Sequence, residues 1–279
     1  MKQFINDFNK IIKTEWKILL SRFGIFVLGW FLFTLSIALY TPTSVGASQI
    51  DFTIFNFLGA FSDGGIRPNG EIDLTSYSTY LLLFYVIMMV ITVIMGSINV
   101  AIDYKKNRNV QKIYWYILFV IGDIISLFII PLGVKMQMLY IDESMFAGYS
   151  ENAVKILRFV VFISAFLIYC LSIALMVYCG IMPGVYNSIA EEFRKLTKMS
   201  YQASRILWDF LLIVPGLILL IFINWSSDLK LAFLGNYLYF GTVFFIFLTG
   251  PLVGVLLKQF NKIYNIKDKT AALYQEPKN

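Results

Sequence analysis

The sequence predicts an all-α transmembrane protein: a six-helix bundle of two inverted-topology three-helix repeats, with short half-helices after helices 1 and 4. Three observations lead to this prediction, namely an apolar composition, six long apolar stretches and an internal repeat. Of 279 residues, 58% are hydrophobic and 14% are charged, whereas about a quarter of the residues in a soluble domain are charged. A chain this apolar needs lipid as its solvent.

Six stretches are long enough to cross the hydrocarbon core of a bilayer, which takes about 20 apolar residues. They are Phe23–Tyr40, Leu81–Val100, Ile113–Val134, Phe159–Cys179, Ile206–Trp225 and Leu231–Leu257. Pro215 and Pro251 are expected to kink or break the fifth and sixth of these helices, because proline cannot donate the helical hydrogen bond.

The basic residues predict the orientation of the chain. If both termini are cytoplasmic, the inner segments hold 18 of the 23 Lys and Arg residues. These inner segments are 1–22, 101–112, 180–205 and 258–279. Cytoplasmic segments carry such an excess, so cytoplasmic termini are expected. The lysines beside the spans orient the protein and meet anionic lipid, so the formal charge of +6 does not indicate nucleic-acid binding.

The chain contains an internal repeat with a constant offset of 136 residues, which relates the first span to the fourth. Eight positions are identical between the two copies. They are Arg22, Phe23, Phe26, Leu35, Ser36, Ile37, Ala38 and Leu39, with their counterparts 136 residues later. Shared apolarity alone would not reproduce an arginine, a serine and an alanine at fixed spacing.

Each copy of the repeat contains three spans, and this odd number has a topological consequence. The first span runs from inside to outside, and the fourth runs from outside to inside. The two halves are therefore expected to be related by a pseudo-two-fold axis in the membrane plane. This construction recurs in secondary transporters.

Segments 46–61 and 184–197 follow the first and fourth spans and are too short to cross the membrane. We expect both to form half-helices that dip into the bundle from opposite faces or lie against it, with Gly46 and Gly184 at their starts. Such starts present free N–H groups and the positive end of the helix dipole. Irregular backbone at membrane depth must be covered by protein or line a water-filled cavity.

The predicted boundaries divide the chain into four parts. Residues 1–20 form a cytoplasmic amphipathic helix on the membrane surface, with an apolar stripe that begins at Phe4. The alternative is that this segment is simply the cytoplasmic start of the first span. The two membrane repeats comprise residues 21–136 and 137–258, and residues 259–279 form a cytoplasmic tail.

Two carboxylates, Asp123 and Asp209, lie within predicted spans. A charge at the bilayer centre costs roughly 2.5–3.5 kcal/mol, so both are expected to face the bundle interior or a wet cavity. Arg205 precedes Asp209 by one helical turn and can pair with it. This pair serves a substrate or ion site, or it pins the fifth helix to the inner interface. Arg22 and Arg158 are expected to be snorkelling anchors.

The composition excludes several kinds of chemistry. The absence of histidine removes His-based acid–base catalysis and most catalytic zinc sites. The sequence contains no nucleotide-binding motif, no metal-ligand cluster and no Ser or Cys nucleophile with a base. We therefore expect no cofactor, no metal and no enzymatic activity.

Several short motifs follow one another in a characteristic order. They are Arg22 to Leu39, Gly46 to Asp51, Ile121-Gly122, Pro183-Gly184, Arg205, Gly241-Thr242 and Gly250-Pro251. This order resembles the YczE/YitT group of bacterial integral membrane proteins, over about residues 20–258. The chain departs from that group where Ala47–Asp51 replaces Pro-Trp-Asp and where Pro183-Gly184 reverses the usual order. The resemblance implies a membrane architecture and a bacterial cell membrane rather than an activity.

Two functions are compatible with these features. The first is a permease for an unidentified small molecule or ion, with a site between the repeats near the bilayer midplane. Its expected pathway residues are Asp123, Asp209, Arg205, Gly46, Asp51 and Gly184. The alternative is a non-transporting scaffold or accessory subunit that docks partners through the basic loop 180–205. A lipid-handling protein or channel is a third, weaker hypothesis. The expected partners are the lipid bilayer, the unknown substrate, and a membrane protein or a second copy of the chain.

Overall fold

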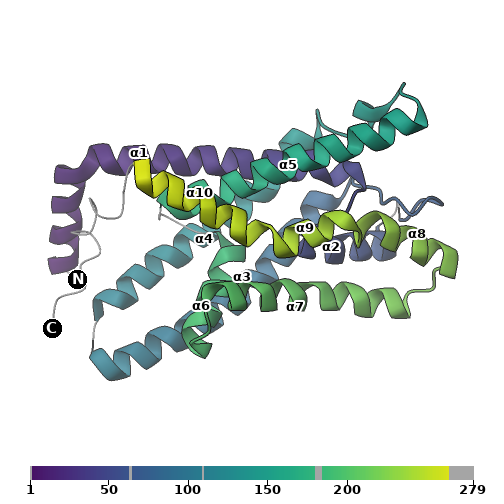
Figure 1. The fold of residues 1–279 in the computed structure, drawn as a ribbon. Helices are drawn as coiled ribbons and strands as arrows, with labels where there is room; N and C mark the ends of the chain where they lie inside the picture. Colours follow the sequence, from purple (N-terminus) through teal and green to yellow (C-terminus); the bar gives the residue numbers. More distant parts are fainter. Residues whose placement is uncertain (1, 63–64, 109, 180–183, 264–279) are drawn as a thin grey trace.

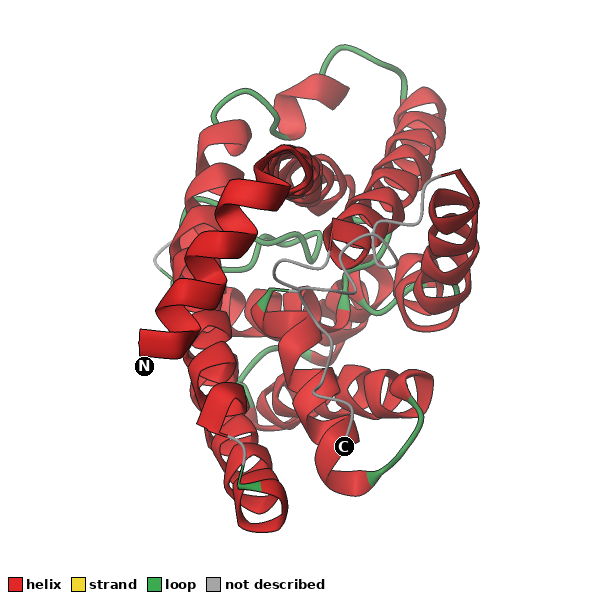
Figure 2. Cartoon of the chain, turned by 90° about the vertical axis from the view of Figure 1, so that its left-hand side faces the viewer, coloured by secondary structure: helices red, strands yellow, loops and turns green. Residues whose placement is uncertain are grey.

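The structure is a computed structural model that describes residues 2–62, 65–108, 110–179 and 184–263. Within these ranges the chain is helical and contains no β-strand (Figures 1 and 2). The α-helices are α1 (Lys2–Tyr40), α2 (Gln49–Phe61), α3 (Tyr77–Asn107), α4 (Val110–Met138), α5 (Glu151–Cys179), α6 (Val185–Thr197), α7 (Tyr201–Phe222), α8 (Ser227–Tyr237), α9 (Phe240–Phe247) and α10 (Thr249–Ile263). Two short 3-10 helices are η1 (Thr41–Thr43) and η2 (Glu143–Phe146).

Length and composition make this chain a multi-pass membrane protein, as the sequence predicted. Among the described residues, five helices are long and apolar enough to cross a membrane, and a bent pair, α8 and α9, makes up to six. The five unbroken segments are Trp16–Thr43, Tyr77–Asn107, Phe119–Met138, Glu151–Cys179 and Ala203–Phe222. Many large apolar side chains on these helices are exposed, as expected where lipid takes the place of water.

The predicted sixth span, Leu231–Leu257, is not one helix. It is divided into α8, α9 and α10, with a bend of 45° between the first two. The second division comes just before Pro251, because this residue has no N–H to donate to the carbonyl of Phe247. The C-terminal boundary of the predicted tail falls outside the described residues, which end at Ile263.

The segment before α2 fills the bend between α8 and α9. The N–H of Gly241 donates to the carbonyl of Val45, and the N–H of Ala47 donates to the carbonyl of Tyr237, both at 3.0 Å. The hydroxyl of Thr242 donates to the same Tyr237 carbonyl at 2.8 Å. Two irregular segments thus satisfy each other's backbone groups, which is the condition for non-helical backbone within a membrane bundle.

Gly46 lies where the segment before α2 crosses the backbone of Gly241, and it is not the start of a half-helix, contrary to the sequence prediction. Its φ of +130° is a conformation that L side chains rarely adopt, and a Cβ atom there would lie 2.7 Å from the backbone of Gly241. Helix α2 begins three residues later, at Gln49, where the hydroxyl of Ser48 accepts the N–H of Asp51. A serine N-cap is strongly preferred at such a start.

Short helices do follow α1 and α5, and each packs against a long helix from the other half of the chain. Helix α2 packs along α7, and α6 packs along α3. The longest interface joins α1 and α5, which run side by side along one edge of the molecule (Figure 1). Helix α4 packs against α1 and α3, and α10 packs against α5.

Pro215 does not break α7, which is helical from Tyr201 to Phe222. The proline removes the hydrogen bond to the carbonyl of Leu211. Beside this gap, the hydroxyl of Thr53 donates to the carbonyl of Leu212. Gly216 lets the two helices approach closely, since its Cβ would lie 2.9 Å from the Thr53 hydroxyl. Helix α2 therefore supports α7 at the proline.

Helix α1 runs without interruption from Lys2 to Tyr40, and Figure 1 draws its first turns at an angle to the rest. The stripe predicted to make residues 1–20 an interfacial helix lies on side chains before Trp16, which are outside the described set. The two interpretations of this segment therefore remain predictions.

Arg22 and Arg158 are not snorkelling anchors. The Arg22 side chain is 3% exposed, and its Nε donates to the carbonyl of Cys179 at 2.6 Å. A cation at the C-terminus of a helix is favourable because it offsets the negative end of the helix dipole. The Arg158 guanidinium donates to Glu71 at 2.7 Å and lies over the ring of Phe146.

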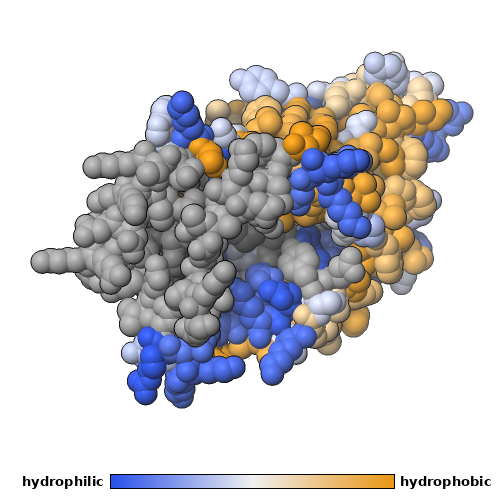
Figure 3. All heavy atoms as spheres, turned by 60° about the vertical axis from the view of Figure 1, so that its left-hand side comes forward, coloured by the Kyte–Doolittle hydropathy of each residue, from blue (hydrophilic) through white to orange (hydrophobic). Residues whose placement is uncertain are grey.

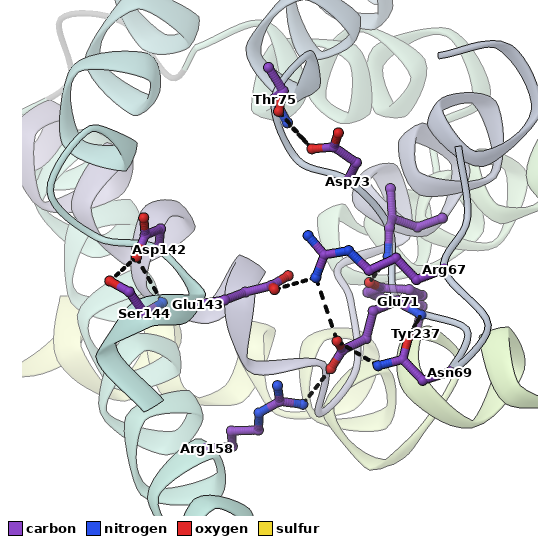
Figure 4. Close-up of polar contacts among 11 residues, drawn as sticks. Arg67, Asn69, Glu71, Asp73, Thr75, Asp142, Glu143, Ser144, Arg158 and Tyr237 are labelled. Carbon is purple, nitrogen blue, oxygen red and sulfur yellow. Dashed lines mark hydrogen bonds and ion pairs between the residues drawn. The ribbon is translucent and has the colours of Figure 1, made fainter. Parts of the chain in front are cut away.

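A polar network ties the loop between α2 and α3 to the start of α5 (Figure 4). Glu71 accepts hydrogen bonds from Arg158 and from Asn69, at 2.7 and 2.8 Å, while Arg67 pairs with Glu143 of η2. Burial alone would raise the pKa of Glu71, but the hydrogen bonds and the charges of Arg158 and Arg67 outweigh it and hold the pKa below its usual value.

This network predicts an acid-sensitive component of stability. A carboxylate with a lowered pKa stabilises the fold fully above its unfolded-state pKa of about 4.3, and this stabilisation is lost as the pH falls through the folded-state value. Glu71→Gln should therefore lower the free energy of unfolding near neutral pH by roughly 1.5–3 kcal/mol. The change should disappear at the acid end of a thermal-unfolding series from pH 7 to pH 3.

The matched control is Glu151→Gln, which removes a carboxylate paired with Lys155 at the surface. Exposed pairs contribute little, so this variant should unfold at the wild-type temperature throughout. Equal behaviour of the two variants would contradict the assigned role of Glu71.

Candidate functional site

The first turn of α2 is built around a buried carboxylate, Asp51. Its side chain is 2% exposed, and it accepts hydrogen bonds from the hydroxyls of Tyr40, Ser48 and Tyr77. The Tyr77 bond to Oδ1 measures 2.5 Å. These donors come from the end of α1, the α2 N-cap and the start of α3. Asp51 therefore fixes the point at which three elements of the first half meet.

A second buried carboxylate, Asp209 of α7, contacts a side chain from the first turn of α6. Nε of Arg205 lies 3.4 Å from its Oδ1, and Tyr186 of α6 donates its hydroxyl to the same oxygen. The Arg205 guanidinium lies over the Tyr186 ring, 4.2 Å from the centroid, in a cation–π contact. The predicted ion pair thus exists, and Tyr186 binds both of its members.

One contact links these two clusters. The Tyr186 hydroxyl lies 3.3 Å from the amide oxygen of Gln49, in the first turn of α2. The two residues are 137 positions apart in the chain. Side chains from the first turns of α2 and α6 therefore meet in the protein interior.

Asp123 of α4 lies on another side of α6. Its side chain is 5% exposed, and Ser188 of α6 lies beside it in the wall of the same cavity. Its Oδ1 atom has no partner among the described residues. The first turn of α6 thus stands between two buried carboxylates, with Tyr186 directed to Asp209 and Ser188 lying beside Asp123.

Asp123 faces a cavity of about 530 Å³ between α3, α4, α5 and α6. The polar and charged side chains in its wall are Thr92, Asn99, Asp103, Tyr116, Asp123, Ser188, Glu191, Glu192 and Lys195. Most of the remaining wall is apolar. Ligand sites of this size are typically apolar with a few well-placed polar groups.

The predicted site residues do not form a single cluster. Asp51, Asp209 and Arg205 are joined through Gln49 and Tyr186. Gly184 is the residue before α6 and has a φ of +76°. Asp123 lies in the wall of the cavity. Gly46 lies neither in the cavity wall nor in the cluster of Asp51, Asp209 and Arg205. Pro183 lies outside the described residues.

Sequence reasoning missed several side chains around the buried carboxylates. They are Tyr40, Ser48, Gln49, Tyr77, Tyr186 and Ser188. A signal existed for Tyr77, because Ser76-Tyr77 before the second span resembles Ser200-Tyr201 before the fifth, and for the two α6 residues, which follow Gly184 closely. Ser48 lies three residues before Asp51, at the spacing of a helix N-cap. Tyr40 and Gln49 become partners only when the chain folds.

The Arg205–Asp209 pair generates a prediction about stability. Asp209→Asn leaves the guanidinium buried without its counter-charge, which should cost roughly 3–5 kcal/mol. The double variant Asp209→Asn/Arg205→Gln removes both charges and should recover much of this loss. Thermal unfolding of wild type, Asp209→Asn, Arg205→Gln and the double variant in detergent measures the coupling between the two residues. Additive effects of the two substitutions would show that the pair is not coupled.

No group of three Cys, Asp or Glu side chains within the described part of the chain is placed to hold a metal ion. No curated protein and no solved structure matches the chain. The sequence does match one protein family, described as a family of unknown function (DUF6198), over residues 20–258. The YczE/YitT resemblance is not confirmed by this match. Since the matched region covers most of the chain, this membrane protein belongs to the DUF6198 family.

Proposed function

We propose that this chain is a permease for a small molecule or ion, built from two inverted three-helix repeats. In this proposal the first half comprises α1 to α4 and the second half comprises α5 to α10. The substrate site lies between the halves, with Asp123 as its principal charged group. The first turns of α2 and α6, with Asp51, Asp209 and Arg205, hold the halves together beside it.

Several helix contacts support the inverted repeat, because they recur when the halves are exchanged; among the described residues, the contact of α3 with α4 has no comparable counterpart between α7 and α8 to α10. Helix α2 packs on α7 as α6 packs on α3, and α1 packs on α4 as α5 packs on α10. The two short helices have 13 residues each. The helices after them both begin at a repeated tyrosine, Tyr77 and Tyr201.

Polar contacts at the last helix of each half also correspond. Thr242 of α9 accepts the N–H of Ala47 just before α2, at 3.3 Å. Asp123 of α4 lies beside Ser188, in the first turn of α6. In the sequence motifs, Asp123 stands where the second half has Thr242. Each half thus contacts the start of the other half's short helix.

The two halves are not in the same state, and this asymmetry is the observation that carries the proposal. The space between α3, α4 and α6 is a cavity. The corresponding space beside α2 is filled by aromatic rings, with centroids 5.8 Å apart for Phe52 and Phe233 and 4.5 Å apart for Phe55 and Tyr237. One open side and one closed side are what alternating access between inverted repeats requires.

The charge distribution supports a cytoplasmic opening. The cavity wall includes Asp103 and Lys195, which lie in two of the segments that hold most of the Lys and Arg residues. Those segments are cytoplasmic by the positive-inside rule. We accordingly place the protein in a bacterial plasma membrane with both termini in the cytoplasm. Since the sequence has no nucleotide-binding motif, transport relies on ion coupling, facilitated diffusion or a partner ATPase.

A scaffold that docks partners through residues 180–205 has less support. Arg194 and Lys195 are already engaged by Glu191 and Glu192 of the same helix, with N–O distances of 2.6 Å in both pairs. The basic character of this segment is therefore partly neutralised within α6.

Flux measurements in proteoliposomes test the proposal. The protein should accelerate the uptake of at least one member of a panel of cationic, neutral and anionic solutes over empty liposomes. Asp123→Asn should reduce that flux by at least about 10-fold, which corresponds to roughly 1.4 kcal/mol. Asp228→Asn makes the same chemical change at an exposed position in α8 and should leave the flux unchanged.

Two results would contradict a permease. One is the absence of flux for the whole panel with folded, correctly reconstituted protein. The other is a flux that is the same for wild type and Asp123→Asn. Recovery of a stoichiometric protein partner by crosslinking through α6, with no flux, would favour the scaffold.

A further inference from the structure

We propose that the cavity beside Asp123 binds an organic cation, namely an ammonium-type head group attached to an apolar body. This inference deepens the proposed permease function by naming the substrate class of the same site. It stands on the charge balance of the cavity wall, on the position of Asp123 and on the nature of the remaining wall.

Among the described residues, the wall holds four acidic side chains, Asp103, Asp123, Glu191 and Glu192, and one basic side chain, Lys195. Lys195 is bonded to Glu192 at 2.6 Å, and Glu191 is held by Arg194 through two bonds, at 2.6 and 2.8 Å. Glu191 and Glu192 are therefore already paired with cations of α6.

Asp123 is in a different situation. Its side chain is 5% exposed and lies in the wall of the cavity. Its Oδ1 atom has no partner within the described ranges. Its neighbour Ser188 in the cavity wall is neutral. An uncompensated carboxylate in a membrane interior is costly, and a cation in the cavity would supply the missing charge.

The rest of the wall favours an organic cation over a metal ion. The apolar side chains are Met89, Val93, Val100, Phe119, Val120, Met176 and Val177. Tyr116 adds an aromatic ring, and its hydroxyl is occupied by the carbonyl of Val93 at 2.8 Å. Methionine and aromatic side chains suit an apolar body, and aromatic faces attract ammonium groups. The described residues offer no three-ligand cluster for a metal.

The cavity is accessible from one end of the molecule. Asp103 and Glu191 are half-buried and Lys195 is exposed, so the wall extends to the surface. Figure 3 turns this end forward and shows hydrophilic residues along its lower edge, whereas the right-hand side of the view is mainly apolar. The negative charge of Asp123 favours the entry of cations over anions.

A pair of isosteric ions of opposite charge tests the proposal. Purified protein in detergent, immobilised on scintillation-proximity beads, is titrated with radiolabelled tetraphenylphosphonium, and unlabelled tetraphenylborate is used as the competing anion. We expect saturable binding of the cation to wild type and to Asp228→Asn. Asp123→Asn should bind at least about 10-fold more weakly, and the anion should not compete.

A second measurement protects the result against misfolding of Asp123→Asn. In a Cys170→Ala/Cys179→Ala background, Thr92→Cys places a thiol in the cavity wall. Tetraphenylphosphonium should slow its alkylation by N-ethylmaleimide, and tetraphenylborate should not. Here Asp123 is intact, so failure of protection counts directly against the proposal.

Several outcomes would overturn the inference. The first is equal binding of tetraphenylphosphonium by wild type and by folded Asp123→Asn. The second is competition by tetraphenylborate that equals competition by the unlabelled cation. The third is a site that binds only sodium ions or protons. The permease proposal fails separately. Cation binding without any flux would support the cation site and contradict the permease. Flux of a neutral or anionic solute without cation binding would support the permease and contradict an organic-cation substrate.

Discussion

The contact between the first turns of α2 and α6 is the constraint on which the rest of the structure depends. A helix of 13 residues cannot cross a bilayer, so its ends must find hydrogen-bond partners inside the protein. The two short helices meet inside the protein through the Gln49–Tyr186 contact. Asp51 lies in the first turn of α2, where the helix dipole favours negative charge, and Asp209 of α7 accepts the Tyr186 hydroxyl from the first turn of α6.

The division of the last membrane segment follows from the same constraint. The chain before α2 must reach the protein interior as irregular backbone, and its N–H and C=O groups need partners there. The bend between α8 and α9 supplies them, through Val45, Ala47, Tyr237 and Gly241. Two glycines make the crossing close enough, and the φ of +130° at Gly46 requires a residue without a side chain.

Much of the architecture follows from the sequence, because apolar length and the repeat are local signals. Short helices after the first and fourth spans, and burial of both intramembrane carboxylates, were predictable in this way. The Tyr40 donor to Asp51 was not, since no sequence pattern singles out Tyr40 and it meets Asp51 only in three dimensions. The broken last span was also missed. Leu231–Leu257 is apolar throughout, and its bend is set by the hydrogen bonds of residues nearly 200 positions earlier.

The claim that most needs a direct measurement is that the halves face opposite sides of the membrane. Single cysteines at Pro68 and Thr197, in a Cys170→Ala/Cys179→Ala background, sit in exposed positions after α2 and at the end of α6. In intact cells treated with a membrane-impermeant maleimide, Pro68→Cys should be labelled, whereas Thr197→Cys should be labelled only after permeabilisation. Labelling of both cysteines from the same side would contradict the inverted repeat and, with it, the proposed mechanism of transport.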